Sequence, residues 1–249
     1  MSGLLVLFAL GCLGYWHSTR SSNARLGGRR NSGHSAQYEP SAQARRAQQR
    51  GEAGEAAVLA ELRRVLTWLC GANFHLHEGA VHIHHAPGTD FPTAEIDHLA
   101  VTPFGIFVIE TKNWSGSITF GALRDELVRT SADGAREIRR SPLAQNRTKV
   151  AFLSDKLPCV WPIDGLGVFA SSECNLHPDL PLRLIHISEL GHWMRQRRHE
   201  FTISGRKPVN VKTAWQAILL NASISESEIV AHRNRVRDKP KGLADDGGQ

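Results

Sequence analysis

The chain has 249 residues, of which 41% are hydrophobic and 22% are charged, with four cysteines and a net charge of +6. These fractions are typical of a globular protein, and the length allows one sizeable domain with extensions or at most two small domains. The cysteines lie far apart and form no C-x-x-C motif. This spacing argues against a disulfide framework or a zinc knuckle and suits a reducing compartment.

The net positive charge comes from one stretch of the chain. Residues 17–50 contain seven arginines and one acidic residue, so they account for the whole net charge of +6, and residues 51–249 sum to zero. Overall basicity is therefore weak support for nucleic-acid binding by a folded domain. The stretch is rich in Ser, Asn, Gly, Gln and Arg, and we expect a disordered linker near anionic lipid rather than a DNA-binding arm. Its last part, from Ser41, has enough alanine, glutamine and arginine to lead into the next helix.

Residues 3–16 form an apolar run with no basic segment before it. A helix of that length reaches roughly 21 Å, against roughly 30 Å for the hydrocarbon core of a bilayer. A short membrane anchor, an uncleaved signal-like segment and a helix buried in protein all stay open for residues 1–16. The arginines that follow favour the anchor, because positive charge beside an apolar segment is retained on the cytoplasmic side. They predict a cytoplasmic domain at the inner face of the membrane.

Apolar residues at helical spacing predict a helix over residues 53–69, with Glu55 in its first turn and a stop near Gly71. An acid near a helix N-terminus is favourable in any protein, so this position alone indicates no function. Residues 74–85 alternate enough to predict a strand, whose histidines we expect to be exposed on a sheet edge. A zinc site among these histidines lacks a cysteine or acid at a recognised spacing.

The segments 95–101 and 106–112 have the pattern of the two strands of a hairpin. Side chains alternate between the faces of a strand, so Glu110 and Lys112 lie on the same face of the second strand. The hairpin can therefore bring Asp97, Glu110 and Lys112 into one small volume.

Carboxylates beside a buried strand lose hydration and repel each other, so they need a shared cation or a proton on one of them. Mg²⁺ suits such a place, because one or two carboxylates and substrate phosphate oxygens commonly hold it. A nearby lysine can contact the scissile phosphate or lower the pKa of an attacking water. This arrangement describes a metal-assisted phosphodiesterase with Asp97 and Glu110 as ligands. The alternative is a surface hairpin with ordinary solvent-facing charges, since E-x-K is a common tripeptide.

The remainder of the chain continues the α/β pattern. After the hairpin we expect a short strand over residues 117–120, a polar excursion over residues 123–140, and a helix over residues 142–157 with Gln145 in its first turn. The best basic patch outside the linker lies here, as a phosphate cradle or a solvated helix face, and comprises Arg136, Arg139, Arg140, Arg147 and Lys149. Two strands follow at residues 165–172 and 182–187, then helices over residues 189–196, 211–220 and 226–237, and a disordered tail over residues 239–249.

Five separated elements of the chain, in this order, resemble the nuclease-related domain (NERD) family, which is similar to the PD-(D/E)xK restriction-endonuclease-like superfamily. They are Gly51-Glu52-Ala53-Gly54-Glu55, then Glu95-Ile96-Asp97, then the segment from Gly105 to Asn113, then Ser115-Gly116, and finally Pro142 with Gln145. The resemblance is close over residues 51–157. It implies an α/β fold with a restriction-endonuclease-like mixed central sheet flanked by helices over residues 51–200. Outside the resemblance, the residue pattern predicts a helical extension over residues 201–238.

The resemblance also implies roles for single residues. Asp97 and Glu110 would bind the metal, with the backbone carbonyl of Thr111 completing its shell. Lys112 would be the catalytic lysine. Two further roles are implied at the edge of the site, Glu55 assisting at the metal or orienting its water and Gln145 positioning Lys112 or the phosphate. The expected activity is hydrolysis of phosphodiester bonds in nucleic acid, in particular DNA, with Mg²⁺ or Mn²⁺. The open alternative is a non-catalytic scaffold of the same fold that binds nucleic acid or a partner at the membrane.

Overall fold

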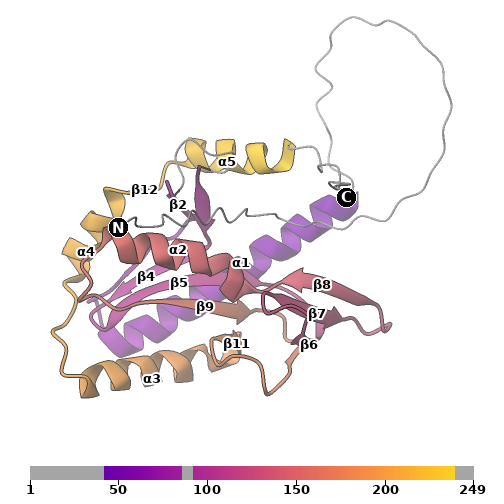
Figure 1. Cartoon of the computed structure of the whole chain (residues 1–249), viewed down its shortest axis with the longest axis horizontal. Helices are drawn as coiled ribbons and strands as arrows, with labels where there is room; N and C mark the ends of the chain where they lie inside the picture. The colour runs from indigo at the N-terminus through magenta and orange to yellow at the C-terminus, as the bar shows by residue number, and fades with distance from the viewer. Residues whose placement is uncertain (1–41, 86–91, 239–249) are drawn as a thin grey trace, which may run out of the picture.

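The computed structural model describes residues 42–85 and 92–238 (Figure 1). The apolar run at residues 3–16, most of the predicted linker and the predicted tail at residues 239–249 lie outside the described residues. Within the described part, no helix is both long enough and apolar enough to cross a membrane.

Helix α1, Ala42–Cys70, begins well before the predicted start at residue 53, inside the segment predicted as a linker. The added turns consist mainly of alanine, glutamine and arginine, which have high helix propensity and extend a helix that tertiary packing already stabilises. The helix ends where predicted. Gly71 takes a left-handed φ of 61° and donates its amide to the Thr67 carbonyl at 2.9 Å, a common way to close a helix.

A five-stranded mixed sheet with the order β1-β4-β5-β9-β11 forms the centre of the fold. Its strands are β1 (His75–Leu76), β4 (His98–Thr102), β5 (Gly105–Lys112), β9 (Ile163–Phe169) and β11 (Leu184–His186). β4 and β5 form the predicted hairpin, whereas β5, β9 and β11 run parallel. The return from β5 to β9 includes helix α2, Pro142–Lys156, as a parallel connection requires. The predicted α/β fold with a mixed sheet flanked by helices is therefore confirmed.

Helices cover both faces of the central sheet (Figure 1). Alternate residues of β5 separate two cores. Phe107 and Ile109 pack with α1 and with α3 (Leu190–Ile203), whereas Ile106 and Val108 pack with α2 and with α4 (Val211–Leu219). α4 lies in the predicted C-terminal extension, yet it contributes fully buried residues to this second core. By the same alternation, Glu110 and Lys112 follow Val108 onto the α2 face of the sheet.

The strand predicted over residues 95–101 is interrupted at Asp97. Its first part, β3 (Ala94–Ile96), pairs with β2 (Val81–Ile83), and β2 also pairs with β12 (Ala222–Ser223) in a separate three-stranded sheet. The histidines were predicted on an edge strand, but β2 is the middle strand of its sheet and buries His82. Asp97 thus lies where the chain leaves one sheet and enters the other.

Residues 123–140, predicted as a polar excursion, form a β-hairpin instead. β7 (Glu126–Thr130) and β8 (Arg136–Arg140) pair antiparallel, and with β6 (Gly116–Phe120) and β10 (Cys174–Leu176) they make a four-stranded sheet. Charged residues fill much of both strands, which hides the apolar alternation that would indicate them. The turn between the two strands contains Gly134, whose φ is 83°.

The chain ends in short elements that pack on this framework. A 3₁₀ turn, η1 (Ile187–Glu189), leads into α3, and α4 and β12 are followed by helix α5 (Glu226–Asp238). α5 lies across β2 at the top of the view in Figure 1, far in sequence from the strands it approaches.

Candidate functional site

Asp97 is fixed by the end of the hairpin ladder. The ladder between β4 and β5 stops at His98 and Ile109, so the next amide of β5 that points toward β4 has no backbone partner there. The Asp97 carboxylate accepts that hydrogen bond from the Thr111 amide at 2.8 Å. The break between β3 and β4 therefore places a carboxylate at the end of β5.

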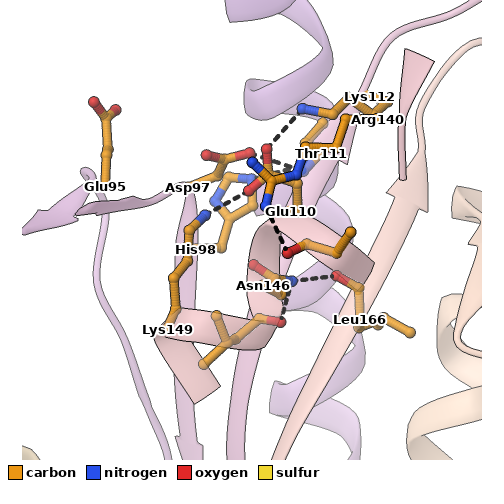
Figure 2. Close-up of polar contacts among 12 residues, drawn as sticks. Glu95, Asp97, His98, Glu110, Thr111, Lys112, Arg140, Asn146, Lys149 and Leu166 are labelled. Carbon is orange, nitrogen blue, oxygen red and sulfur yellow. Dashed lines mark hydrogen bonds and ion pairs between the residues drawn. The ribbon is translucent and has the colours of Figure 1, made fainter. Parts of the chain in front are cut away.

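Glu110 lies in the same place and is held by two lysines. Its Oε1 accepts a hydrogen bond from Lys112 Nζ at 2.6 Å, and its Oε2 accepts one from Lys149 Nζ, also at 2.6 Å. All three side chains are largely shielded, with exposed fractions of 8% for Glu110 and Lys149 and 18% for Lys112. Figure 2 shows Asp97, Glu110 and Lys112 gathered at this end of the strands, as the sequence predicted, with Lys149 approaching from α2.

Helix α2 contributes Asn146 and Lys149 rather than Gln145. Gln145 lies in the first turn, half-buried, and within the described chain its side chain donates no hydrogen bond to the carboxylates. Asn146 instead donates to the Val108 and Leu166 carbonyls, both at 3.0 Å, and so joins α2 to β5 and β9 (Figure 2). A signal for this exists in the sequence, because Asn146 and Lys149 lie seven and four residues before Leu153 and so share its buried stripe.

The predicted basic patch is therefore divided. Lys149 is turned inward and buried, not part of a solvated face. Three of the arginines have partners, Arg147 forming an ion pair with Asp125, Arg139 one with Glu137, and Arg140 a hydrogen bond to the Ala144 carbonyl. Positive charge nearest to Asp97 and Glu110 comes from lysines.

Glu55 approaches the same cluster from α1. Gly54 makes this approach close, since a Cβ atom there would lie 2.7 Å from Cβ of Asn113, the residue after Lys112. Asn113 in turn donates to the Arg50 carbonyl of α1 at 2.7 Å. Burial raises the pKa of Glu55, and the charges of Glu110 and Lys112 act on it as well, so its carboxyl is part of the same electrostatic group.

His98 lies behind the carboxylates, on the opposite face of the hairpin. Its Nε2 is 3.0 Å from Thr111 Oγ1, and burial lowers the pKa of its ring to about 4. Thr111 thus has two links, its amide to Asp97 and its hydroxyl to His98. A neutral, buried ring in this position holds the strands together and does not face the two acids.

The two acids have opposite pKa shifts. Burial and the neighbouring charge of Glu110 raise the pKa of Asp97 to about 7. Burial alone would raise the pKa of Glu110 too, but Lys112 and Lys149 more than offset it and lower it to about 2. Burial lowers the pKa of Lys112, but the attraction of the Glu110 and Asp97 carboxylates outweighs it, so the pKa is raised. At neutral pH Glu110 is therefore ionised and lies between two lysine side chains, whereas Asp97 is protonated in part of the molecules.

Two carboxylates, Asp97 and Glu110, meet two lysines here, so the side chains themselves balance the charge of the group. Hard oxygen donors of this kind suit a divalent cation of the Mg²⁺ type. In the described residues, no cluster of three or more His, Cys, Asp and Glu side chains has the arrangement of a protein-only metal site. Further oxygens would have to come from the backbone, water or a bound phosphate.

A comparison with known protein families gives an independent result. The model of the nuclease-related domain matches residues 50–170, a segment that runs from the middle of α1 to the end of β9 and contains every predicted site residue. No curated protein and no solved structure matches the chain. The predicted resemblance to the nuclease-related domain family is therefore confirmed over residues 50–170.

Proposed function

We propose that this nuclease-related domain hydrolyses phosphodiester bonds in nucleic acid, in DNA in particular, with Mg²⁺ or Mn²⁺. The observation that supports this most is the meeting of Asp97, Glu110 and Lys112 at the end of one hairpin, on the face covered by α2. Separate elements build the group, and burying so many charges is unfavourable unless they serve a purpose beyond stability.

The donors at this place fit a hard divalent ion. Asp97 and Glu110 would hold it, with the Thr111 carbonyl as a third protein donor. Thr111 N occupies one Asp97 oxygen and leaves the other for an ion. Each Glu110 oxygen already accepts from a lysine, but a carboxylate oxygen has a second lone pair. When bound, the ion would neutralise phosphate charge and lower the pKa of a coordinated water.

The protein side chains would do the remaining work. Because the pKa of Lys112 is raised, its amine is an ammonium at neutral pH, which suits stabilisation of negative charge on the phosphate rather than proton abstraction. Lys149 would hold Glu110 Oε2 from the opposite side and fix its rotamer. Glu55, whose pKa burial raises, would orient the attacking water.

The alternative is a binding module without catalysis, and the same contacts supply its support. Both Glu110 oxygens form hydrogen bonds to lysines, so the group is electrostatically complete enough to persist without an ion. A module of this kind would bind nucleic acid or a partner equally well with EDTA and with Mg²⁺.

The test is cleavage of labelled single-stranded, double-stranded and branched DNA, and of single-stranded RNA, by the full chain with Mg²⁺, Mn²⁺ or EDTA. Asp97→Asn and Lys112→Gln are the site variants. Asp155→Asn and Lys156→Gln are matched controls, because these two residues form an exposed ion pair on the last turn of α2.

We expect metal-dependent cutting that both site variants lose and both controls retain. Cutting that survives in Asp97→Asn would contradict the assigned site. If no substrate is cut and calorimetry detects no binding of Mg²⁺ or Mn²⁺, the binding module becomes the better account.

A further inference from the structure

An arginine from outside the family-matched segment lies beside the candidate site. Arg233 of α5 forms an ion pair with Glu95 of β3, two residues before Asp97. Its Nε is 3.2 and 3.1 Å from the two Glu95 oxygens, and its Nη2 also donates to Oε1. Because β3 leads directly into Asp97, this ion pair fixes α5 to the strand that positions one of the two acids.

Arg233 is also within electrostatic reach of the site itself. Hydrogen bonding to Glu95 raises the pKa of Arg233, and the charges of Glu55 and Asp97 act in the same direction. In return, the positive charge of Arg233 is the largest influence opposing burial on the pKa of Glu55. In Figure 2 the Glu95 carboxylate points away from the cluster around Glu110.

Accessibility separates Arg233 from the other cations of the group. The side chains of Lys112 and Lys149 are 18% and 8% exposed and both are committed to Glu110. The Arg233 side chain is 55% exposed and lies on the solvent side of Glu95, which is 20% exposed. A polyanion that approaches this group of carboxylates (Glu55, Glu95, Asp97 and Glu110) needs a cation that it can reach. Arg233 is far more accessible than either lysine.

The geometry of the arginine suits a phosphate. A guanidinium has five N–H donors in a planar fork that matches carboxylate and phosphate oxygens equally. The ion pair with Glu95 uses Nε and Nη2 and leaves the donors of Nη1 for another acceptor. Glu95 therefore orients the guanidinium through contacts from both Nε and Nη2.

We propose that Arg233 contacts a backbone phosphate of the nucleic acid that enters this site, so that helix α5 completes a substrate-binding surface that the nuclease-related segment does not contain by itself. Glu95 positions the Arg233 guanidinium and competes with the phosphate for its N–H donors. This inference rests on the proposed nucleic-acid function and adds a binding residue to it.

A purely structural ion pair makes a different prediction. If Arg233 and Glu95 only fasten α5 to β3, removing either partner loosens the same contact, and both variants change in the same direction. If Arg233 binds phosphate, Arg233→Gln removes a contact, whereas Glu95→Gln frees the fork and removes a repelling charge. The two variants then change affinity in opposite directions.

The experiment is fluorescence anisotropy of one labelled oligodeoxynucleotide, single-stranded and as a duplex, with the full chain in EDTA over a range of salt. The variants are Arg233→Gln, Arg233→Lys and Glu95→Gln. Arg63→Gln and Glu78→Gln are controls for the charge change alone, because these residues form a highly exposed ion pair between α1 and the loop that joins β1 to β2. Melting temperatures are recorded for every variant.

For Arg233→Gln we expect about tenfold weaker binding and a salt slope smaller by about 1 than that of the wild type. We expect Arg233→Lys to recover only part of the affinity, since an ammonium lacks the fork. Glu95→Gln should bind more tightly than the Glu78→Gln control.

Three results overturn the inference. Equal effects of Arg233→Gln and Arg63→Gln leave the proposed function intact and remove Arg233 from the surface. Weaker binding and lower melting temperature in both Arg233→Gln and Glu95→Gln identify a structural ion pair. A wild-type chain that neither binds nor cuts these oligonucleotides contradicts the proposed function and the inference together.

Discussion

Glu110 has an unusual balance of partners, one buried carboxylate between two lysines. Each contact is short, and Lys149 is as well shielded as Glu110 itself. A buried ion pair adds little net stability, but removal of one member is costly when it leaves the other charge uncompensated. Substitution of the carboxylate and substitution of a lysine should therefore change the free energy of unfolding by different amounts.

We expect Glu110→Gln to destabilise the protein by about 3–5 kcal/mol, because two shielded ammonium groups lose their counterion. Lys149→Met should cost less, since Lys112 still neutralises Glu110. The double variant should be more stable than Glu110→Gln alone, because it removes one of the two stranded charges. Urea unfolding of the three proteins measures this order, with Lys156→Met as an exposed control. A larger loss for Lys149→Met than for Glu110→Gln would contradict it.

The raised pKa of Asp97 has a consequence for pH dependence. In the folded protein the pKa is about 7, against an ordinary value of 3.8, so between these values the folded protein keeps a proton that the unfolded chain has lost. The folded state is favoured by that proton at low pH, and its advantage declines as pH rises through this window. Above pH 7 the full cost of an ionised, shielded Asp97 is present.

Asp97→Asn removes this titration while keeping an oxygen for the Thr111 amide. In metal-free buffer we expect the variant and the wild type to be about equally stable at pH 4, and the variant to be about 1–3 kcal/mol more stable at pH 8. Chemical denaturation at the two pH values tests this, with Asp155→Asn as the exposed control. A stability difference that is the same at both pH values would show that Asp97 titrates normally.

The sequence indicated these acids for a simple reason. Glu110 and Lys112 share a face because a strand has a period of two, and a hairpin brings Asp97 near them. Lys149 was predicted to lie in a basic patch, either a phosphate cradle or a solvated helix face, because the residues around it in sequence are basic. The decisive information was the position of Lys149 on the helix relative to Leu153. Gln145 lies outside that buried stripe, and its predicted role toward Lys112 or a phosphate stays a prediction.

At the scale of elements, the junction of α1 with β5 determines how close Glu55 comes to the acids. Gly51 and Gly54 both lie inside α1, one turn apart, yet they differ in surroundings. A Cβ atom at Gly54 would lie 2.7 Å from Cβ of Asn113, whereas one at Gly51 would meet nothing within 4 Å. The two glycines therefore form a matched pair for testing this junction.

We expect Gly51→Ala to stabilise the protein by about 0.5–1 kcal/mol, since alanine is the better helix former and meets no obstacle. Gly54→Ala should destabilise it by about 1–3 kcal/mol, because the new methyl group must displace Asn113 or the helix. Activity should fall in Gly54→Ala alone, as Glu55 moves with the helix. Thermal melts and the cleavage assay measure both effects. Equal stabilisation by the two substitutions would mean that α1 does not pack closely here.

Element boundaries show where local patterns stop being informative. The β4–β5 hairpin was predictable because its turn and its buried residues are consecutive. The break at Asp97 was not, because β3 leaves for a sheet whose other strands, β2 and β12, are distant in the chain. β7 and β8 were missed because their stability comes from pairing with each other and with β6, while charged side chains obscure the alternation.

At the scale of the whole molecule, the family-matched segment, the folded unit and the stretch that carries the net positive charge cover different parts of the chain. The matched segment ends at residue 170, but Leu190, Trp193 and Met194 of α3 are buried against α1, and α4 is buried against the opposite face of the sheet. The folded unit is thus larger than the matched segment. Half of the net charge of +6 lies before Ala42 and the other half lies in the first turns of α1, so the part before Ala42 can be separated from the fold by experiment.

Removal of residues 1–41 deletes the apolar run together with four arginines and one glutamate, and lowers the net charge from +6 to +3. The described fold begins at Ala42, so we expect the melting temperature to be unchanged. Binding to phosphatidylserine-containing vesicles should be lost, because apolar insertion and about 1 kcal/mol per basic residue near an anionic surface both disappear. The rate of cutting at saturating substrate should be the same as for the full chain.

Vesicle sedimentation of three proteins separates the two contributions. The full chain should bind phosphatidylserine vesicles more tightly than neutral phosphatidylcholine vesicles. A full-length variant with Arg20, Arg25, Arg29 and Arg30 changed to glutamine keeps the apolar run, and should bind both kinds of vesicle equally and weakly. If the shortened chain sediments with vesicles as well as the full chain does, the membrane contact belongs to the folded domain. In that case the basic residues of α1 and α3, and not the N-terminal segment, would be the next surfaces to substitute.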